Sequence, residues 1–99
     1  MMTNKAYDVV VIGAGVIGTS TAYHLVKKGL SVALVDRSDV ARGTSSHCDA
    51  MAMLTDKQPG ADAALGYASI LRFLELQKEL SYDFECHQEG SLYVCENDS

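Results

Sequence analysis

One glycine-rich segment constrains the fold of this 99-residue chain more than any other part of it. Residues 13–18, GAGVIG, have the spacing G-x-G-x-x-G and directly follow the β-branched run at residues 7–12. An apolar run without alternation suits a strand covered on both faces, as in a parallel sheet. Small and apolar residues over 16–28 then recur at helical spacing. The sequence therefore predicts a strand, a glycine-rich turn and a helix in succession.

The residues that follow complete a strand–helix–strand unit. Lys27 and Lys28 suit the negative end of a helix dipole, and Gly29 suits a left-handed cap. Residues 30–35, LSVALV, return to strand composition and end at Asp36. A strand, a helix and a strand within about thirty residues form a βαβ unit, whose strands lie parallel.

The second half of the chain has a less complete pattern. Residues 37–46 are polar and small, which predicts a loop with room for a helical turn. Pro59 and Gly60 predict a turn, and residues 61–80 predict a long helix that is apolar on more than one side. Residues 90–95, GSLYVC, predict one further strand. Because these elements do not close a sheet, we expect the opening of a larger protein.

Composition and charge argue against several classes of protein. Hydrophobic residues at 47% and charged residues at 21% are ordinary globular values. A net charge of −5 offers no basic surface, so we expect no nucleic-acid partner. No apolar run approaches the roughly 18 residues of a membrane span, and no signal-peptide pattern appears, so we expect a cytoplasmic protein. Cys48, Cys86 and Cys95 are odd in number and lack C-x-x-C spacing, which predicts free, metal-free thiols.

The glycine-rich turn is the predicted binding site for a nucleotide cofactor. The spacing is informative here because it follows a strand, opens a helix and precedes an acid at the end of the next strand. Gly13 permits a tight turn, Gly15 lets the backbone approach a pyrophosphate, and Gly18 lets helix and strand pack closely. The amides of Val16 and Ile17 are expected to face a phosphate from the helix N-terminus.

Asp36 is the acid that accompanies this turn. Its carboxylate is placed to accept hydrogen bonds from the hydroxyl pair of a ribose. The same negative charge would repel a 2′-phosphate, which disfavours NADP.

These residues resemble the glycine and D-amino-acid oxidase family of flavoproteins, especially its cyanide-forming glycine dehydrogenase and its proline and hydroxyproline dehydrogenase members. The resemblance is carried by residues 8–18, by the sequence VDR at residues 35–37 and by RGTSS at residues 42–46. Residues 48–51 and 90–94 resemble the family more loosely. Family members are several times longer than this chain, and their catalytic residues would lie downstream.

The resemblance implies FAD as the cofactor. It implies that Asp36 holds the adenosine ribose, that Arg37 lies by the adenine, and that residues 43–46 follow the pyrophosphate and ribityl chain. Ala50, where many relatives have glycine, and Met51 would pass close to the flavin ring. The predicted cofactor-binding residues are Gly13, Ala14, Gly15, Val16, Ile17, Gly18, Asp36, Arg37, Arg42, Gly43, Thr44, Ser45, Ser46, Ala50 and Met51. No residue is assigned to catalysis or to a metal.

The predicted fold class is α/β, an N-terminal βαβ of a Rossmann-like FAD-binding domain. Residues 1–60 form its ADP-binding segment and pyrophosphate loop, and residues 61–99 lead into a truncated substrate domain. The resemblance implies an oxidoreductase that transfers a hydride to flavin from an amine or amino acid of the glycine, D-amino-acid, sarcosine or proline type. Two alternatives stay open: a non-catalytic nucleotide-binding module or subunit, and the start of an NAD-dependent dehydrogenase. The expected partners are that small substrate and the missing C-terminal remainder or a partner subunit.

Overall fold

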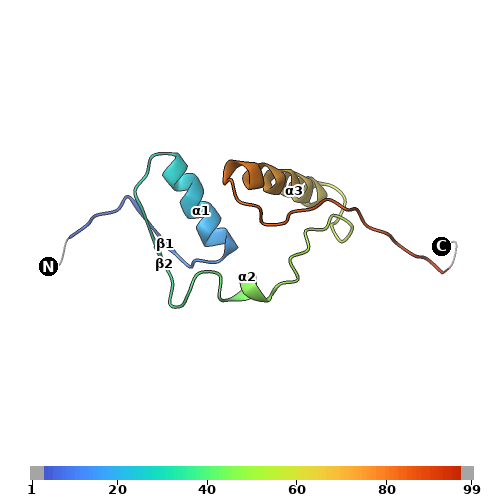
Figure 1. Cartoon of the computed structure of the whole chain (residues 1–99), viewed down its shortest axis with the longest axis horizontal. Helices are drawn as coiled ribbons and strands as arrows, with labels where there is room; N and C mark the ends of the chain where they lie inside the picture. The colour runs from blue at the N-terminus through green and yellow to red at the C-terminus, as the bar shows by residue number, and fades with distance from the viewer. Residues whose placement is uncertain (1–3, 97–99) are drawn as a thin grey trace. The chain divides into compact units, whose positions relative to one another are not determined.

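The computed structural model describes residues 4–96 of the chain. Its elements, in order, are β1 (Val9–Ile12), α1 (Val16–Lys27), β2 (Val32–Val35), α2 (Thr44–His47) and α3 (Ala61–Glu79) (Figure 1). The chain divides into two compact units, Met1–Met51 and Ala52–Ser99. The first holds both strands with α1 and α2, and the second holds α3.

The first unit is the predicted βαβ unit. β1 and β2 pair in parallel, with Val9 opposite Val32 and Ile12 opposite Val35. α1 connects the two strands and contacts both of them. The α/β class and the strand–helix–strand start, which suits a Rossmann-like FAD-binding domain, are therefore confirmed.

Both strands begin two residues later than the sequence indicated. Just before the strands begin, a side chain takes part in the bonding between the two segments. Asp8 Oδ2 accepts hydrogen bonds from the Ser31 amide at 2.8 Å and from the Ser31 hydroxyl at 2.7 Å. The Asp8 amide in turn donates to the Ser31 carbonyl at 3.0 Å. This reciprocal set of bonds fixes the register at the N-terminal ends of the two strands.

Two glycines allow the turn after β1 to be as tight as the sequence predicts. Gly13 has a φ of 105°, in the region that favours glycine, and its amide donates to the Val35 carbonyl at 2.8 Å. A Cβ on Gly18 would overlap the carbonyl oxygen of Gly13 and would lie 2.9 Å from its carbonyl carbon. α1 can therefore start beside the turn only because residue 18 has no side chain.

Most side chains in the described part of the chain are partly or fully exposed. Among residues 4–96 only Ala14 is buried, at 2% exposure. On the strand and helix that flank the turn, Ile12 is 86% exposed and Ile17 is 80% exposed. The sequence predicted a first strand covered on both faces, and within residues 4–96 that cover does not form.

The second unit is built around α3, which matches the predicted helix. Gly60 precedes it with a φ of 106°, and Asp62 Oδ2 accepts a hydrogen bond from the Gln58 amide at 3.1 Å. Gly66 lies against the preceding segment, since a Cβ there would come within 2.9 Å of Leu54 Cδ2. Residues 52–60 thus belong to the same compact unit as the helix, and the domain boundary at residue 60 stays a prediction. No helix among residues 4–96 is long and apolar enough to cross a membrane.

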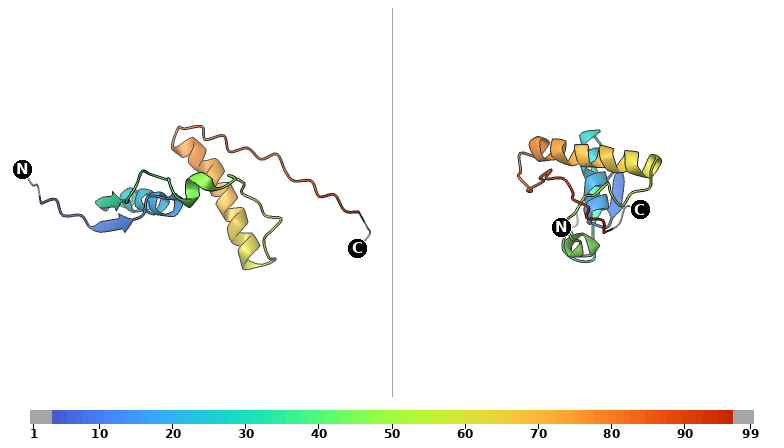
Figure 2. Two further views of the ribbon diagram at one scale, coloured as in Figure 1. Left: turned by 90° about the horizontal axis from the view of Figure 1, so that it is seen from below. Right: turned by 90° about the vertical axis from the view of Figure 1, so that its right-hand side faces the viewer.

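The strand predicted at residues 90–95 is wrong for the described chain. Residues 82–96 contain no strand, and Figure 2 shows them as an extended trace after α3. Leu92 and Val94 are 89% and 86% exposed. A strand needs a neighbouring strand to bond its amides and carbonyls, and none of residues 4–96 supplies one to this segment.

The contact at Gly18 gives a stability prediction. Gly18→Ala should lower the free energy of unfolding by about 1–3 kcal/mol, because the new methyl group displaces the Gly13 carbonyl or the start of α1. Gly43→Ala is the control, since a Cβ there meets nothing within 4 Å at a φ of −88°. Urea unfolding of the full chain measures both variants, and equal midpoints would show that the contact at Gly18 is tolerated.

Candidate cofactor site

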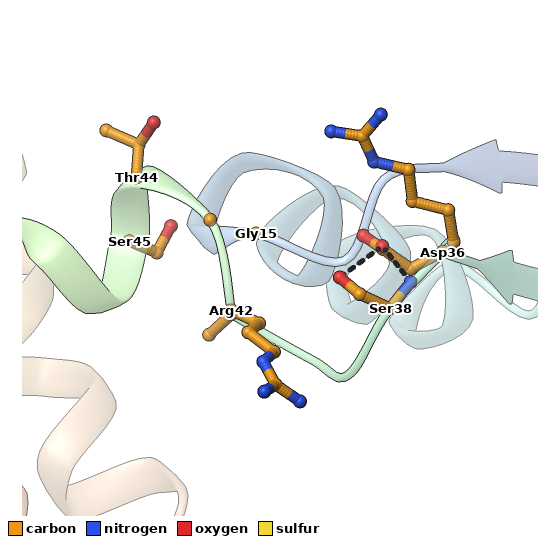
Figure 3. A pocket seen from close by; sticks show the side chains of 9 residues that line it. Gly15, Asp36, Ser38, Arg42, Thr44 and Ser45 are labelled. Carbon is orange, nitrogen blue, oxygen red and sulfur yellow. Dashed lines mark hydrogen bonds between the residues drawn. The ribbon is translucent and has the colours of Figure 1, made fainter.

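A pocket of about 380 Å³ lies at the carboxyl ends of β1 and β2 (Figure 3). Ligands commonly bind at this edge of an open α/β sheet. Seven of the predicted cofactor-binding residues line it: Gly15, Asp36, Arg37, Arg42, Gly43, Thr44 and Ser45. Ser38 and Ala41 line it as well and were not predicted. The sequence could have predicted Ser38, because an aspartate side chain often bonds the backbone two residues further along the chain and Ser38 lies two residues after Asp36.

Asp36 is the most connected side chain of the pocket. Its Oδ2 accepts a hydrogen bond from the Ala14 amide at 2.7 Å, and its Oδ1 accepts one from the Ser38 amide at 2.9 Å. Figure 3 shows the bonds between Asp36 and Ser38. The bond from Ala14, followed by that from Ser38, lowers the pKa of Asp36 below its ordinary value. The carboxylate is therefore ionised at neutral pH and keeps lone pairs for further donors.

Ala14 is held through both of its backbone groups. Its amide donates to Asp36, and its carbonyl accepts a hydrogen bond from the Ala41 amide at 2.9 Å. Ala41 has a φ of 60°, an uncommon conformation for a residue other than glycine. The predicted site residue Ala14 thus does not line the pocket but fixes the turn that does.

Ser45 reaches the glycine-rich turn from the loop after β2. Its Oγ accepts a hydrogen bond from the Val16 amide at 3.0 Å, and a Cβ on Gly15 would lie 3.2 Å from that oxygen. Figure 3 shows the Ser45 hydroxyl directed toward Gly15. The Val16 amide, expected to face a phosphate, is therefore bonded to a side chain of the protein itself.

The other predicted residues lie outside the pocket. The Ser46 hydroxyl donates to the Gly43 carbonyl at 3.0 Å, so its hydrogen bond lies within the single turn of α2. Ala50 has a φ of 57°, in the left-handed region that favours glycine. Met51 is 63% exposed, and its amide donates to Asp49 Oδ1 at 3.2 Å. Four residues of the turn and of α1 are also absent from the lining: Gly13, Val16, Ile17 and Gly18.

The pocket lining contains charged residues of both signs. Arg37 and Arg42 are the basic residues of the lining, and Arg42 Nη1 lies 2.8 Å from Asp39 Oδ2. Guanidinium groups, hydroxyls and a backbone free of Cβ at Gly15 suit a pyrophosphate. The ionised Asp36 suits the hydroxyls of a ribose, and together these groups fit the ADP part of a dinucleotide.

The described part of the chain offers no candidate metal centre. Within residues 4–96, no group of three or more His, Cys, Asp or Glu side chains is placed to hold a metal ion. Cys48, Cys86 and Cys95 are free cysteines in this part of the chain.

Two aspartates give a pH prediction. The pKa of Asp8 is also lowered, first by the Ser31 hydroxyl and then by the Ser31 amide. Each carboxylate therefore adds stability that is complete above the unfolded-state pKa of about 3.9 and is lost as the pH falls through its lower folded-state pKa. The free energy of unfolding should be level above about pH 5 and should decrease below about pH 4.

Single substitutions separate the two contributions. Asp36→Asn and Asp8→Asn should each make the acid-side decrease shallower, and the double variant should make it shallower still. Urea unfolding from about pH 6 to about pH 2 measures this. A profile that Asp36→Asn leaves unchanged would contradict the role given to its bond with Ala14.

Comparison with known proteins finds relatives that match between about half and nearly all of the chain. It is 34% identical over 87 residues to human mitochondrial dimethylglycine dehydrogenase, covering 86% of this chain and 10% of that protein. It is 34% identical over 101 residues to glycine oxidase of Bacillus licheniformis, covering 96% of this chain and 27% of that protein. The aerobic glycerol-3-phosphate dehydrogenase of Bacillus subtilis is 47% identical over 45 residues, which cover 46% of this chain and 8% of that enzyme.

The chain thus spans 27% or less of the length of these relatives. No solved structure matches it significantly. The model of the FAD dependent oxidoreductase family matches residues 8–99. That match confirms both the family indicated by the sequence and FAD as its cofactor. The chain belongs to the family of FAD dependent oxidoreductases.

Proposed function

We propose that residues 1–60 bind the ADP part of FAD in an oxidoreductase that oxidises an amine or amino acid. The observation that supports this most directly is the bond between the Ala14 amide and Asp36 Oδ2 at 2.7 Å. This bond holds an ionised carboxylate beside the glycine-rich turn, and such a pair suits the ribose and the phosphates of a dinucleotide.

Each group of the pocket has a place along the cofactor in this proposal. Asp36 accepts hydrogen bonds from the adenosine ribose, and Arg37 lies by the adenine. Arg42, Thr44 and Ser45 contact the pyrophosphate, to which Arg42 contributes positive charge. These contacts orient the cofactor and set the direction in which its flavin end leaves the pocket.

The flavin supplies the hydride acceptor when FAD is bound. The chain's own residues bind and orient the cofactor, and none of them is assigned a proton transfer. Ala50 and Met51 follow α2 and would lead toward the ring. The residues that hold the substrate belong to a further part of the protein, which would also cover the exposed apolar side chains such as Ile12 and Leu65. We propose that the protein acts in the cytoplasm.

The coverage of the relatives favours an amine or amino acid as the substrate. Glycine oxidase and dimethylglycine dehydrogenase match 96% and 86% of the chain. The glycerol-3-phosphate dehydrogenases match under half of it, 46% and 48%. A shared cofactor-binding turn explains a match of that extent, whereas the longer matches extend beyond it. Glycerol 3-phosphate remains the second candidate substrate.

A substitution at Gly15 tests cofactor binding. Gly15→Val in the full-length protein should weaken FAD binding about tenfold or more, or about 1.4 kcal/mol, because its side chain would occupy the approach of the pyrophosphate. Ser20→Val adds a comparable side chain at an exposed position of α1 and serves as the control. Flavin content measured by absorbance decides the result, and a Gly15→Val protein with the flavin content of the wild type would refute the site.

Anaerobic reduction of the bound flavin tests the substrate class. At least one compound among glycine, sarcosine, dimethylglycine, proline and D-amino acids should bleach the flavin absorbance. Glycerol 3-phosphate should leave the absorbance unchanged. Bleaching by glycerol 3-phosphate alone would contradict an amine or amino acid substrate and would favour glycerol 3-phosphate as the substrate. A flavin that none of these compounds reduces would favour a non-catalytic nucleotide-binding subunit.

A further inference from the structure

We draw no further inference here: the strongest candidate, the exposed apolar face of the β1–β2 sheet formed by Val10, Ile12 and Val35, carries nothing because no part of residues 4–96 shows what covers it.

Discussion

The Asp36 carboxylate joins the two segments from which the pocket is made. Its bond to the Ala14 amide ties the turn after β1 to the end of β2, and the Gly13 amide adds a second tie to the Val35 carbonyl at 2.8 Å. The Ala41 amide then binds Ala14 from the other side. Because Ala14 is held from both sides, the position of Gly15 and the direction of α1 follow from it. The geometry offered to a pyrophosphate depends on these polar bonds more than on a hydrophobic core.

The same carboxylate is the acidic group of the pocket lining. Asp36 stays ionised at neutral pH because backbone amides lower its pKa. Its negative charge belongs beside hydroxyl groups, whereas Arg42 and the Ser45 hydroxyl lie where negative charge can be accepted. An adenosine diphosphate has hydroxyls and phosphates in this sequence. In the proposed complex, the ribose end of the dinucleotide would therefore meet Asp36.

The features that could be predicted from sequence are those that short stretches of chain determine alone. The βαβ unit, the tight turn at Gly13 and the helix α3 depend on periodicity, on glycine and on hydrogen bonds within one segment. The bonds from Val16 to Ser45 and from Ser31 to Asp8 join residues that are 29 and 23 positions apart in the sequence. No local sequence pattern predicts such bonds. The prediction of a strand at residues 90–95 was wrong for a related reason. A segment of strand composition forms a strand only where a neighbouring strand can bond its amides and carbonyls.

The exposure of the apolar residues bears on how the site holds its shape. Ile12 and Ile17 flank the glycine-rich turn and remain 86% and 80% exposed, so little burial supports the turn from outside. Each of these hydrogen bonds contributes modestly, because folding exchanges bonds to water for bonds within the protein. A ligand that binds only the folded turn adds its own free energy to this small sum. In the proposed complex, FAD would therefore stabilise the fold that binds it, and the bonds at Ala14 and Ser45 would select the conformation that FAD reinforces.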